Sequence, residues 1–495
     1  MAFEKFKITF VYPDFESIGI EYLMSLCLRA GHEVELVFYR AENAYLGKRQ
    51  KEISFKTIAL KIAKTNPDLV AFSCVTDNYQ YQLHGARALK KIRPRMTTIF
   101  GGIHPTAVPK TVLQEPAVDA VAIGEADISF IQFLKNSQKK DGQFTLPNKK
   151  IKGVVFKKNG KQRGEFKEGD LVNLDTLPFP YKDPFLQSLK ETTFKYAIIT
   201  SRGCPYDCSY CLQSTIHKMR GKRIVRQRSA ANVIEELLRA KKKYQFKIVY
   251  FMDDLFTVNK KWLLRFLALY RRKIGLPFGC ATHPECLDKK LAKLLGSAGC
   301  IFASFGVQSL SPGLSREVLN RMLNKKKIIQ TIKYLKQAGI MVQADHILGI
   351  PGDTLKNQEE AVLFYNQHRP DLVSVFWLTY YPKAPIVQTA FNQGILSRRD
   401  IEKIERGEKV ANGTFHDGGS MKDPKPYYSF QLILNYLSFL PEWLIRILVK
   451  SGGYRFLRIR NFYLATALPR IIKSATDKRD FWGRSLLISF FNPKD

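Results

Sequence analysis

Apolar runs of strand length alternate with amphipathic helical segments along most of this 495-residue chain. Such alternation predicts parallel sheets covered by helices, and a polar stretch divides it into two sets. In the first set, residues 18–30 have helical periodicity and separate the first two of five strand-like runs, at 7–12, 33–39, 68–75, 97–102 and 118–124. We therefore predict a doubly wound, Rossmann-like α/β domain over residues 1–135, with ligands bound where its strands end in loops.

The second set contains six strand-like runs, at 196–200, 248–252, 278–282, 302–308, 342–350 and 372–381. Six βα units are too few for a closed eight-stranded barrel, so we predict a partial (β/α)6 TIM-type barrel over residues 191–390. Its functional loops should follow the carboxyl ends of the strands. The polar segment 136–190 between the two sets contains Asn159-Gly160, which predicts a linker with a small hairpin.

Three of the eight cysteines, Cys204, Cys208 and Cys211, lie in TSRGCPYDCSYC, immediately after the first strand of the second set. Their spacing would place them on one face of a helix as buried thiols, but the glycine, proline and aspartate around them favour a loop. The length of the chain and its few cysteines argue against a disulfide framework. Structural zinc takes four ligands, and no matching cysteine or histidine follows nearby. Three thiolates on a loop suit an iron–sulfur cluster with one iron left open.

CPYDCSYC resembles the cluster motif of the radical S-adenosylmethionine (SAM) enzymes, with an aromatic residue just before the last cysteine. Further segments resemble the members of that superfamily that bind cobalamin. They are LDTLPFPYKDPF (174–185), IVYFMDDLF (248–256), FGVQSLS (305–311) and HILGIPGDT (346–354). FGGIHPTAVP (100–109) and VDAVAIGEAD (118–127) resemble the cobalamin-binding domain of these enzymes. The ordered combination covers roughly residues 5 to 390 and is far more specific than any single motif.

The resemblance implies a 4Fe-4S cluster on Cys204, Cys208 and Cys211, whose fourth iron binds the amino and carboxylate groups of SAM. One electron, from a reducing partner such as flavodoxin or ferredoxin, then cleaves SAM to methionine and a 5′-deoxyadenosyl radical. By position, the residues expected to contact SAM are Tyr210, Asp253, Asp254, Gln308, Ser309, Leu348 and Gly349. Alternatively, the two aspartates cap the following helix, and Pro351-Gly352 forms only the turn after a strand. Gln308 stands where the family often has glutamate.

The resemblance also implies a cobalamin site at the strand ends of the first domain. The residues expected there are Asp14, Glu16, Ser73, Thr76, Gly101, Gly102 and Glu125. Many such domains carry Asp-x-His-x-x-Gly, with the histidine below the cobalt, whereas DFESIG (14–19) has Glu16 at the histidine position. A carboxylate is a poor substitute for imidazole on low-valent cobalt. We predict cobalamin without a histidine ligand, or else a domain that has lost the cofactor, and we expect His104 to shape a turn.

The formal net charge of +35 calls for an anionic partner. Residues 391–495 form a basic, aromatic, helical region with two interpretations. One is an amphipathic helix in a membrane interface, anchored by Trp443 and flanked by Arg446 and Lys450. The other is a helical cap that covers the open barrel. No signal peptide is apparent, so we expect a cytoplasmic protein, with peripheral contact to the inner face of the membrane under the first interpretation.

The predicted function is a cobalamin-dependent radical SAM enzyme that modifies an unactivated carbon of a small or lipid-like molecule, most often by methyl transfer in this subgroup. A cyclisation, oxygenation or rearrangement with the same cofactors is the alternative. The charge also suggests tRNA modification. The resemblance argues against nucleic acid, because such tRNA enzymes carry a second three-cysteine site in the N-terminal domain. Here that half of the chain has only Cys27 and Cys74.

Overall fold

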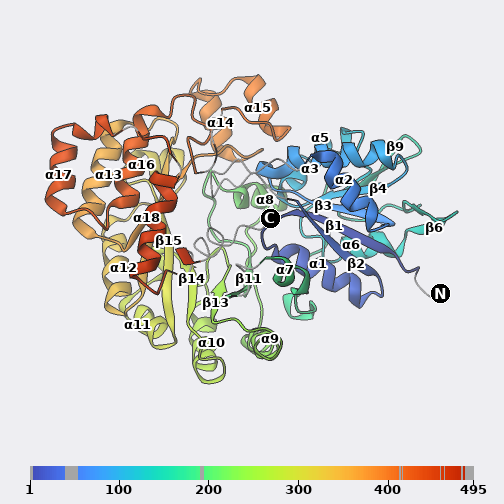
Figure 1. Cartoon of the computed structure of the whole chain (residues 1–495), viewed down its shortest axis with the longest axis horizontal. Helices are drawn as coiled ribbons and strands as arrows, with labels where there is room; N and C mark the ends of the chain where they lie inside the picture. Colours follow the sequence, from blue (N-terminus) through green and yellow to red (C-terminus); the bar gives the residue numbers. More distant parts are fainter. Residues whose placement is uncertain are drawn as a thin grey trace.

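The computed structural model describes residues 4–39, 54–189, 194–411, 414, 416–457, 459–461, 463–480 and 483–484. Two α/β domains lie side by side, and the C-terminal helices pack against the second of them (Figure 1). The expected boundary between linker and barrel, at residues 190 and 191, lies outside the described residues.

The first sheet has the strand order β2-β1-β3-β4-β5-β8-β9. Its five parallel strands are β1 (Lys7–Pro13), β2 (Glu33–Tyr39), β3 (Leu69–Ser73), β4 (Thr97–Gly101) and β5 (Ala120–Ala122). This order is the doubly wound one, and it confirms the fold predicted for this domain. From β1 the chain adds β2 on one side and then β3 on the other, so the strand order reverses between the parallel strands β1 and β3. Doubly wound folds bind ligands at this switch point.

Helices cover both faces of this sheet because its strands alternate apolar side chains between the two faces. Phe10 packs against α1 (Ile18–Arg29) and α6 (Ser129–Lys135), whereas its neighbour Val11 faces the opposite side. That opposite side is covered by α2 (Phe55–Lys64), α3 (Thr76–Ile92) and α5 (Pro109–Gln114). The short helix α4 (Ile103–Ala107) follows β4.

The segment between the domains contributes to the first sheet. β8 (Val154–Lys158) pairs antiparallel with β5, and β9 (Lys161–Arg163) pairs with β8. Asn159 and Gly160 join them with φ of +51° and +71°, which confirms the predicted hairpin. A second hairpin, β6 (Gln138–Lys140) with β7 (Gln143–Thr145), and helix α7 (Asp183–Ser188) complete the segment.

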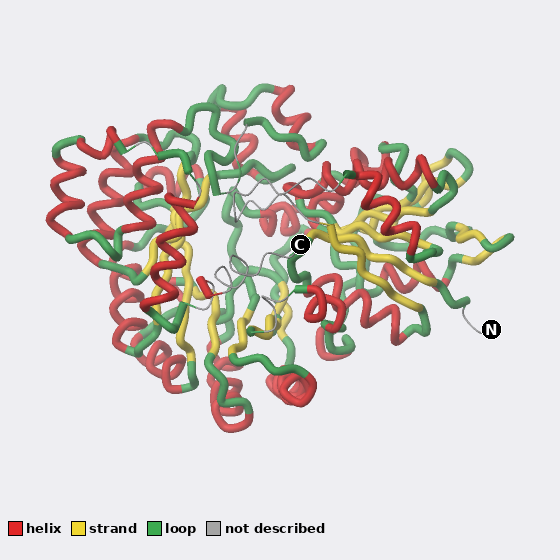
Figure 2. Tube along the Cα trace, in the orientation of Figure 1, coloured by secondary structure: helices red, strands yellow, loops and turns green. Residues whose placement is uncertain are grey.

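The second sheet is parallel, and its six strands follow one another in chain order. They are β10 (Lys195–Ile198), β13 (Ile248–Phe251), β14 (Phe278–Thr282), β15 (Cys300–Gln308), β16 (Met341–Leu348) and β17 (Leu372–Trp377). Its outer helices are α9 (Ala230–Lys243), α10 (Lys260–Lys273), α11 (Lys289–Ser297), α12 (Lys325–Gln337) and α13 (Leu355–His368) (Figure 2). The partial barrel is thereby confirmed.

Each of these outer helices begins where a polar side chain accepts a hydrogen bond from a backbone N–H three residues later. The capping residues are Ser229, Asn259, Asp288, Asn324 and Thr354. Between β10 and β13, the chain forms the two-residue ribbon β11 (Ser201–Arg202) with β12 (Arg226–Gln227), and helix α8 (Leu212–Arg220).

The C-terminal region forms a helical cap on the barrel. α16 (Tyr428–Tyr436) shares the apolar core of the barrel, and Trp377 of β17 donates its indole N–H to Gln431 Oε1 at 3.0 Å. α17 (Glu442–Lys450) packs on α13, and Arg470 of α18 (Leu468–Thr476) reaches Gln343 on the inner face of the sheet.

The segment that follows β17 bridges the two domains. It contains α14 (Pro385–Asn392) and α15 (Arg398–Glu405), and Gly407 after α15 lies against the rings of Tyr79 and His104 of the first domain. Within the described ranges, no helix is long and apolar enough to cross a membrane.

Candidate active site between the two domains

The cysteine motif forms a loop between β11 and α8, at the carboxyl end of the first barrel strand. Gly203 opens this loop at φ +97°, and a Cβ there would lie 2.1 Å from the carbonyl oxygen of Ile224. The Cys211 N–H donates to the carbonyl oxygen of Cys208 at 3.0 Å, which closes a turn between them. The loop prediction is therefore confirmed over the helix alternative. Cys208 is buried, whereas Cys204 and Cys211 are half-buried.

The surroundings of these thiols determine how readily they ionise. Burial raises the pKa of Cys204 to about 11 and that of Cys211 to about 12. Backbone N–H groups of Tyr206 and Gln213 act in the opposite direction by donating to these two sulfur atoms. The thiols are close enough to oppose ionisation of one another. Ligation as thiolates therefore needs additional positive charge.

Arg321 supplies such a charge beside the loop. Its Nη1 lies 3.6 Å from Cys208 Sγ, and its Nη2 donates to the carbonyl oxygen of Gly306 on β15. The guanidinium thus links the cysteine loop to the fourth strand of the barrel. The cysteine motif gives no signal for Arg321, because the arginine follows it by more than a hundred residues.

The two aspartates after β13 have different surroundings. The buried Asp253 carboxylate accepts hydrogen bonds from the Thr200 N–H at 3.1 Å, from Thr200 Oγ1 at 2.8 Å and from the hydroxyl of Ser201. Asp253 therefore joins the ends of β10 and β13 beneath the cysteine loop, where it positions that loop. Asp254 accepts from Gln213 Nε2 at 2.8 Å, and burial raises its pKa. Neither aspartate caps the following helix α10, whose cap is Asn259.

Gln308 and Ser309 end the fourth barrel strand on the same edge of the sheet. Gln308 has φ +67°, a left-handed conformation that costs energy for any residue other than glycine. Its Oε1 is buried, and no hydrogen bond reaches it from the described residues. Ser309 is buried, and its Oγ accepts from the Ser311 N–H at 3.2 Å. Gln308 therefore has a buried amide oxygen that no described residue satisfies, whereas Ser309 is used within its own turn.

Three other predicted SAM contacts differ in what they can offer a ligand. Tyr210 packs beside the apolar cluster that contains Leu314 and Ile347. The Leu348 side chain is fully buried in the core under the outer helices, so only the backbone of Leu348 can face the barrel interior. Its expected contact with SAM stays a prediction. Gly349 has φ +80°, and a Cβ there would lie 3.6 Å from Met421 Sδ, so the C-terminal region covers this turn.

Glu16, at the position where the family often has histidine, lies in a buried cluster. Lys182 Nζ is 2.8 Å from Glu16 Oε1 and 2.7 Å from Glu21 Oε2, and the Lys182 and Glu21 side chains are fully buried. Burial alone lowers the pKa of Lys182, but the two carboxylates raise it well above its usual value. Glu16 therefore binds a lysine of the interdomain segment, and its expected contact with cobalamin stays a prediction. Asp14 lies at the end of β1, where its N–H donates to the Tyr39 carbonyl oxygen at 3.0 Å.

Ser73, Gly101 and Gly102 lie together at the carboxyl ends of β3 and β4. Gly102 has φ +95°, and a Cβ there would lie 2.6 Å from the carbonyl oxygen of Cys74. Only glycine allows this approach of the two loops. The Ser73 carbonyl oxygen accepts from Gln82 Nε2 at 2.7 Å. Gly102 therefore shapes the edge of the first domain that faces the barrel.

His104 is a core residue of the first domain. It is fully buried, stacks on Tyr79 with ring centroids 4.2 Å apart, and has Nδ1 3.2 Å from Thr76 Oγ1. Burial lowers its pKa to about 3, so the ring is neutral near pH 7. His104 lies in the short helix α4 rather than in an open turn. The Thr76 hydroxyl, expected near cobalamin, is turned toward this ring.

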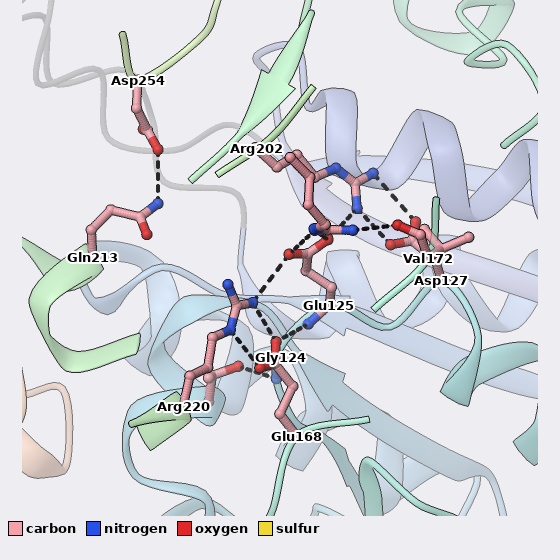
Figure 3. A network of polar contacts seen from close by, with 11 residues as sticks. Gly124, Glu125, Asp127, Glu168, Val172, Arg202, Gln213, Arg220 and Asp254 are labelled. Carbon is pink, nitrogen blue, oxygen red and sulfur yellow. Dashed lines mark hydrogen bonds and ion pairs between the residues drawn. The ribbon is translucent and has the colours of Figure 1, made fainter. Parts of the chain in front are cut away.

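Glu125, another predicted cobalamin contact, is the centre of an ion-pair network between the domains (Figure 3). It binds Arg202 at 2.7 Å and Arg220 at 3.1 Å, and it also accepts from Arg226. Burial opposes ionisation of Glu125, but the arginines hold its pKa below the usual value. Asp127 pairs with Arg202 as well. Glu125, just after β5, therefore connects the strand ends of the first domain to the ribbon and helix beside the cysteine loop.

A cleft of about 300 Å³ lies next to this network. Gly102, Gly124 and Glu125 of the first domain line one side, while Gln213 and Asp254 of the barrel line the other. Parts of both predicted cofactor sites thus face one shared space. Figure 3 shows Gln213 and Asp254 hydrogen-bonded to each other on the barrel side of the ion-pair network.

Two protein families match the two domains separately. The B12-binding domain family matches residues 7–134, and the radical SAM superfamily matches residues 198–365. The chain is a radical SAM enzyme with a B12-binding domain. The two domains imply a 4Fe-4S cluster, SAM and cobalamin as its cofactors.

Relatives and solved structures agree with this assignment. An uncharacterized methyltransferase of Pyrococcus horikoshii is 28% identical over 409 residues, which cover 79% of this chain and 84% of the relative. The anaerobic magnesium-protoporphyrin IX monomethyl ester cyclase of Rubrivivax gelatinosus is 24% identical over 400 residues, covering 76% and 68%. The structure of the cobalamin-dependent SAM radical enzyme OxsB with aqua-cobalamin superposes with a TM-score of 0.65 at 15% identity, covering 99% and 75%. This last likeness concerns the fold.

The donor set of the cysteine loop fits an iron–sulfur cluster. Three thiols of Cys204, Cys208 and Cys211 share one loop, two of them accept backbone N–H groups, and Arg321 lies beside the third. In the described part of the chain, no three His, Cys, Asp or Glu side chains are already gathered as a metal-ligand set.

The inner face of the barrel carries a polar group that the sequence motifs do not indicate. Asp345 on β16 accepts from Gln343 Nε2 at 2.7 Å, and Gln343 in turn accepts from Arg470 of α18. Arg470 also pairs with the buried Asp480 at 2.9 Å. Burial raises the pKa of Asp345 to about 7. Because alternate residues of β16 face inward, sequence periodicity could have placed Asp345 inside the barrel but not its partners.

Proposed function

We propose that this enzyme transfers a methyl group to an unactivated carbon of a small or lipid-like molecule. The observation that carries the proposal is the cleft of about 300 Å³, because it is lined by the cobalamin-domain edge on one side and by residues beside the cysteine loop on the other. A methyl donor held by one domain and a radical source held by the other would meet there. The methyltransferase among its relatives supports the same reaction.

The cofactors would supply the methyl group and a one-electron reagent that removes hydrogen from carbon. The residues of the chain hold these groups in place. Cys204, Cys208 and Cys211 would ligate the cluster, and Arg321 would balance part of its negative charge. The carboxylate of Asp253 keeps the cysteine loop against the barrel edge.

The substrate would enter the barrel from the cleft and lie over its inner face. Asp345 is a carboxyl group on that face, and hydrogen bonds from the described residues reach only one of its oxygen atoms. The other oxygen can accept from a hydroxyl or an ammonium group. Phe302 and Tyr250 belong to a buried apolar cluster on the inner face of the sheet, so the substrate would lie on the cleft side of this cluster.

Cyclisation without methyl transfer is the second candidate, because the cyclase of Rubrivivax gelatinosus is among the relatives. Both reactions begin with the same hydrogen removal and need the same reducing partner. We propose a flavodoxin or a ferredoxin for that role, since such small acidic carriers would be attracted by a chain of net charge +35.

The test uses protein purified without oxygen, reconstituted with iron, sulfide and cobalamin, and incubated with SAM and a reductant. Methyl transfer predicts bound corrinoid together with both 5′-deoxyadenosine and S-adenosylhomocysteine. Deoxyadenosine with corrinoid but without the homocysteine product would favour cyclisation. Cys208→Ala should abolish all SAM cleavage, whereas Cys27→Ala, a buried thiol of the other domain, should leave it unchanged. Full activity of Cys208→Ala would overturn the proposal.

A further inference from the structure

The outer side of α17 and the following turn η6 (Gly453–Phe456) exposes large apolar side chains. Trp443 is 63% exposed, Ile447 is 56% exposed and Phe456 is 90% exposed. Trp443 and Ile447 are one helical turn apart, so they lie on the same face of α17. The opposite face is already used, because Ile445 and Val449 are buried in the barrel core. We call the three exposed side chains the apolar edge.

Basic side chains surround the apolar edge. They are Arg446, Lys450 and Arg455, all exposed and, among the described residues, without an ion-pair partner. The nearest carboxylate on the helix, Glu442, already pairs with Arg369 at 3.5 Å. The edge therefore has three cations without an ion-pair partner next to its apolar tip, and Arg455 also donates to the Tyr454 hydroxyl at 3.5 Å, close to Glu359. This combination, with tryptophan at the boundary, is typical of helices that lie in the interface of an anionic membrane.

The position and size of the apolar edge favour a membrane over a protein partner. Three side chains at these exposures present about 400 Å², since a large aromatic contributes about 150–250 Å² when fully covered. One side of a stable protein interface needs about 800 Å². α17 also lies at the end of the molecule farthest from the B12-binding domain (Figure 1), so contact there leaves the interdomain cleft accessible.

We propose that the apolar edge and its basic rim dock the enzyme onto an anionic lipid surface. The three apolar side chains would enter the boundary between headgroups and acyl chains, and the cations would contact the headgroups. Docking is independent of the proposed methyl transfer, because it requires neither cofactor nor substrate. It would hold the enzyme beside a lipid-like substrate if that substrate class is correct.

The test is sedimentation of the full chain with sucrose-loaded vesicles of phosphatidylcholine, with or without about one third phosphatidylglycerol. The apolar variant carries W443S, I447S and F456S. The basic variant carries R446Q, K450Q and R455Q. The control variant removes three exposed cations at the end of α10, by R271Q, R272Q and K273Q. Size-exclusion chromatography with light scattering records the oligomeric state of each protein.

We expect binding to vesicles that contain phosphatidylglycerol and at least tenfold weaker binding to pure phosphatidylcholine. The apolar and basic variants should each lose at least tenfold in affinity for the anionic vesicles, while the control variant stays within about twofold of the original chain. Equal losses of vesicle affinity in the control and basic variants would overturn the proposal, because binding would then depend on the total positive charge and not on the apolar edge. Absence of binding by the original chain would also overturn it. A dimer that the apolar variant dissociates would identify the edge as an interface between copies instead.

Discussion

Asp345→Asn should stabilise the protein at alkaline pH, although it removes a charge from the interior of the barrel. The carboxylate of Asp345 has its pKa raised from 3.8 to about 7 by burial. The folded state therefore binds a proton that the unfolded state has lost, and ionisation opposes folding as pH rises from about 4 to about 7. Its polar and charged surroundings are Gln343, Ser374, Arg321 and Arg470.

A shift of about three pH units corresponds to a cost of at most about 4 kcal/mol above pH 7. Because Asp345 is only partly covered, we expect about 2–3 kcal/mol. Asparagine retains the oxygen that accepts from Gln343, so it removes the cost without losing that hydrogen bond. The melting temperature of Asp345→Asn should exceed that of the original chain by about 2–3 °C at pH 8, and by much less at pH 5.

The measurement is thermal unfolding followed by circular dichroism at several pH values. Asp288→Asn is the matched control with the opposite sign. The exposed ion pair with Lys260 lowers the pKa of Asp288, so its stabilisation is present at neutral pH and is lost on acidification. A constant loss of stability in Asp345→Asn at every pH would refute the reasoning, because it would mean that Asp345 is ionised and well paired in the folded protein.

Two further substitutions test the boundary between the domains. Lys182→Met should lower the free energy of unfolding by about 3–5 kcal/mol at pH 8 and by less at pH 5. At pH 8 the carboxylates of Glu16 and Glu21 would remain buried without a cation, whereas protonation at pH 5 relieves part of that cost. Denaturant unfolding at pH 8 and pH 5 measures the two losses, and equal losses would contradict this explanation. Gly102→Ala should lower the melting temperature far more than Gly142→Ala. Both glycines have positive φ, but only at Gly102 would the added Cβ clash with a neighbouring backbone. Equal effects of the two substitutions on the melting temperature would show that the loop next to Gly102 can move aside.

The architecture could be predicted from local sequence because its signals are local. Alternating apolar runs indicated both parallel sheets, and Asn159-Gly160 indicated a turn whose two positive φ values the structure confirms. The partner of β8 could not be read in this way. A hairpin motif fixes how two strands face each other, but not which sheet edge accepts them, and that edge is β5.

The site residues that belong to one contiguous motif could be predicted from the sequence. The contacts between residues far apart in the chain could not. The cysteine loop is contiguous, so its position at the first strand end followed from the sequence. Glu16 and Glu125 were expected at cobalamin because of their positions along the family pattern. Their actual partners lie far away in the chain: Lys182 is 166 residues from Glu16, and Arg226 is 101 residues from Glu125.

These distant pairs have a common location, because both Glu16 and Glu125 lie at strand ends of the first domain that face the second. A buried ion pair contributes little net stability but costs several kcal/mol when one partner is removed. The pairs of Glu125 with arginines of the barrel therefore penalise other arrangements of the two domains. Interfaces between domains of one chain are otherwise permissive of relative motion. The carboxylates at these strand ends thus oppose a change in the width of the cleft between the cysteine loop and the cobalamin-binding edge, as the proposed methyl transfer between two separately held cofactors would require.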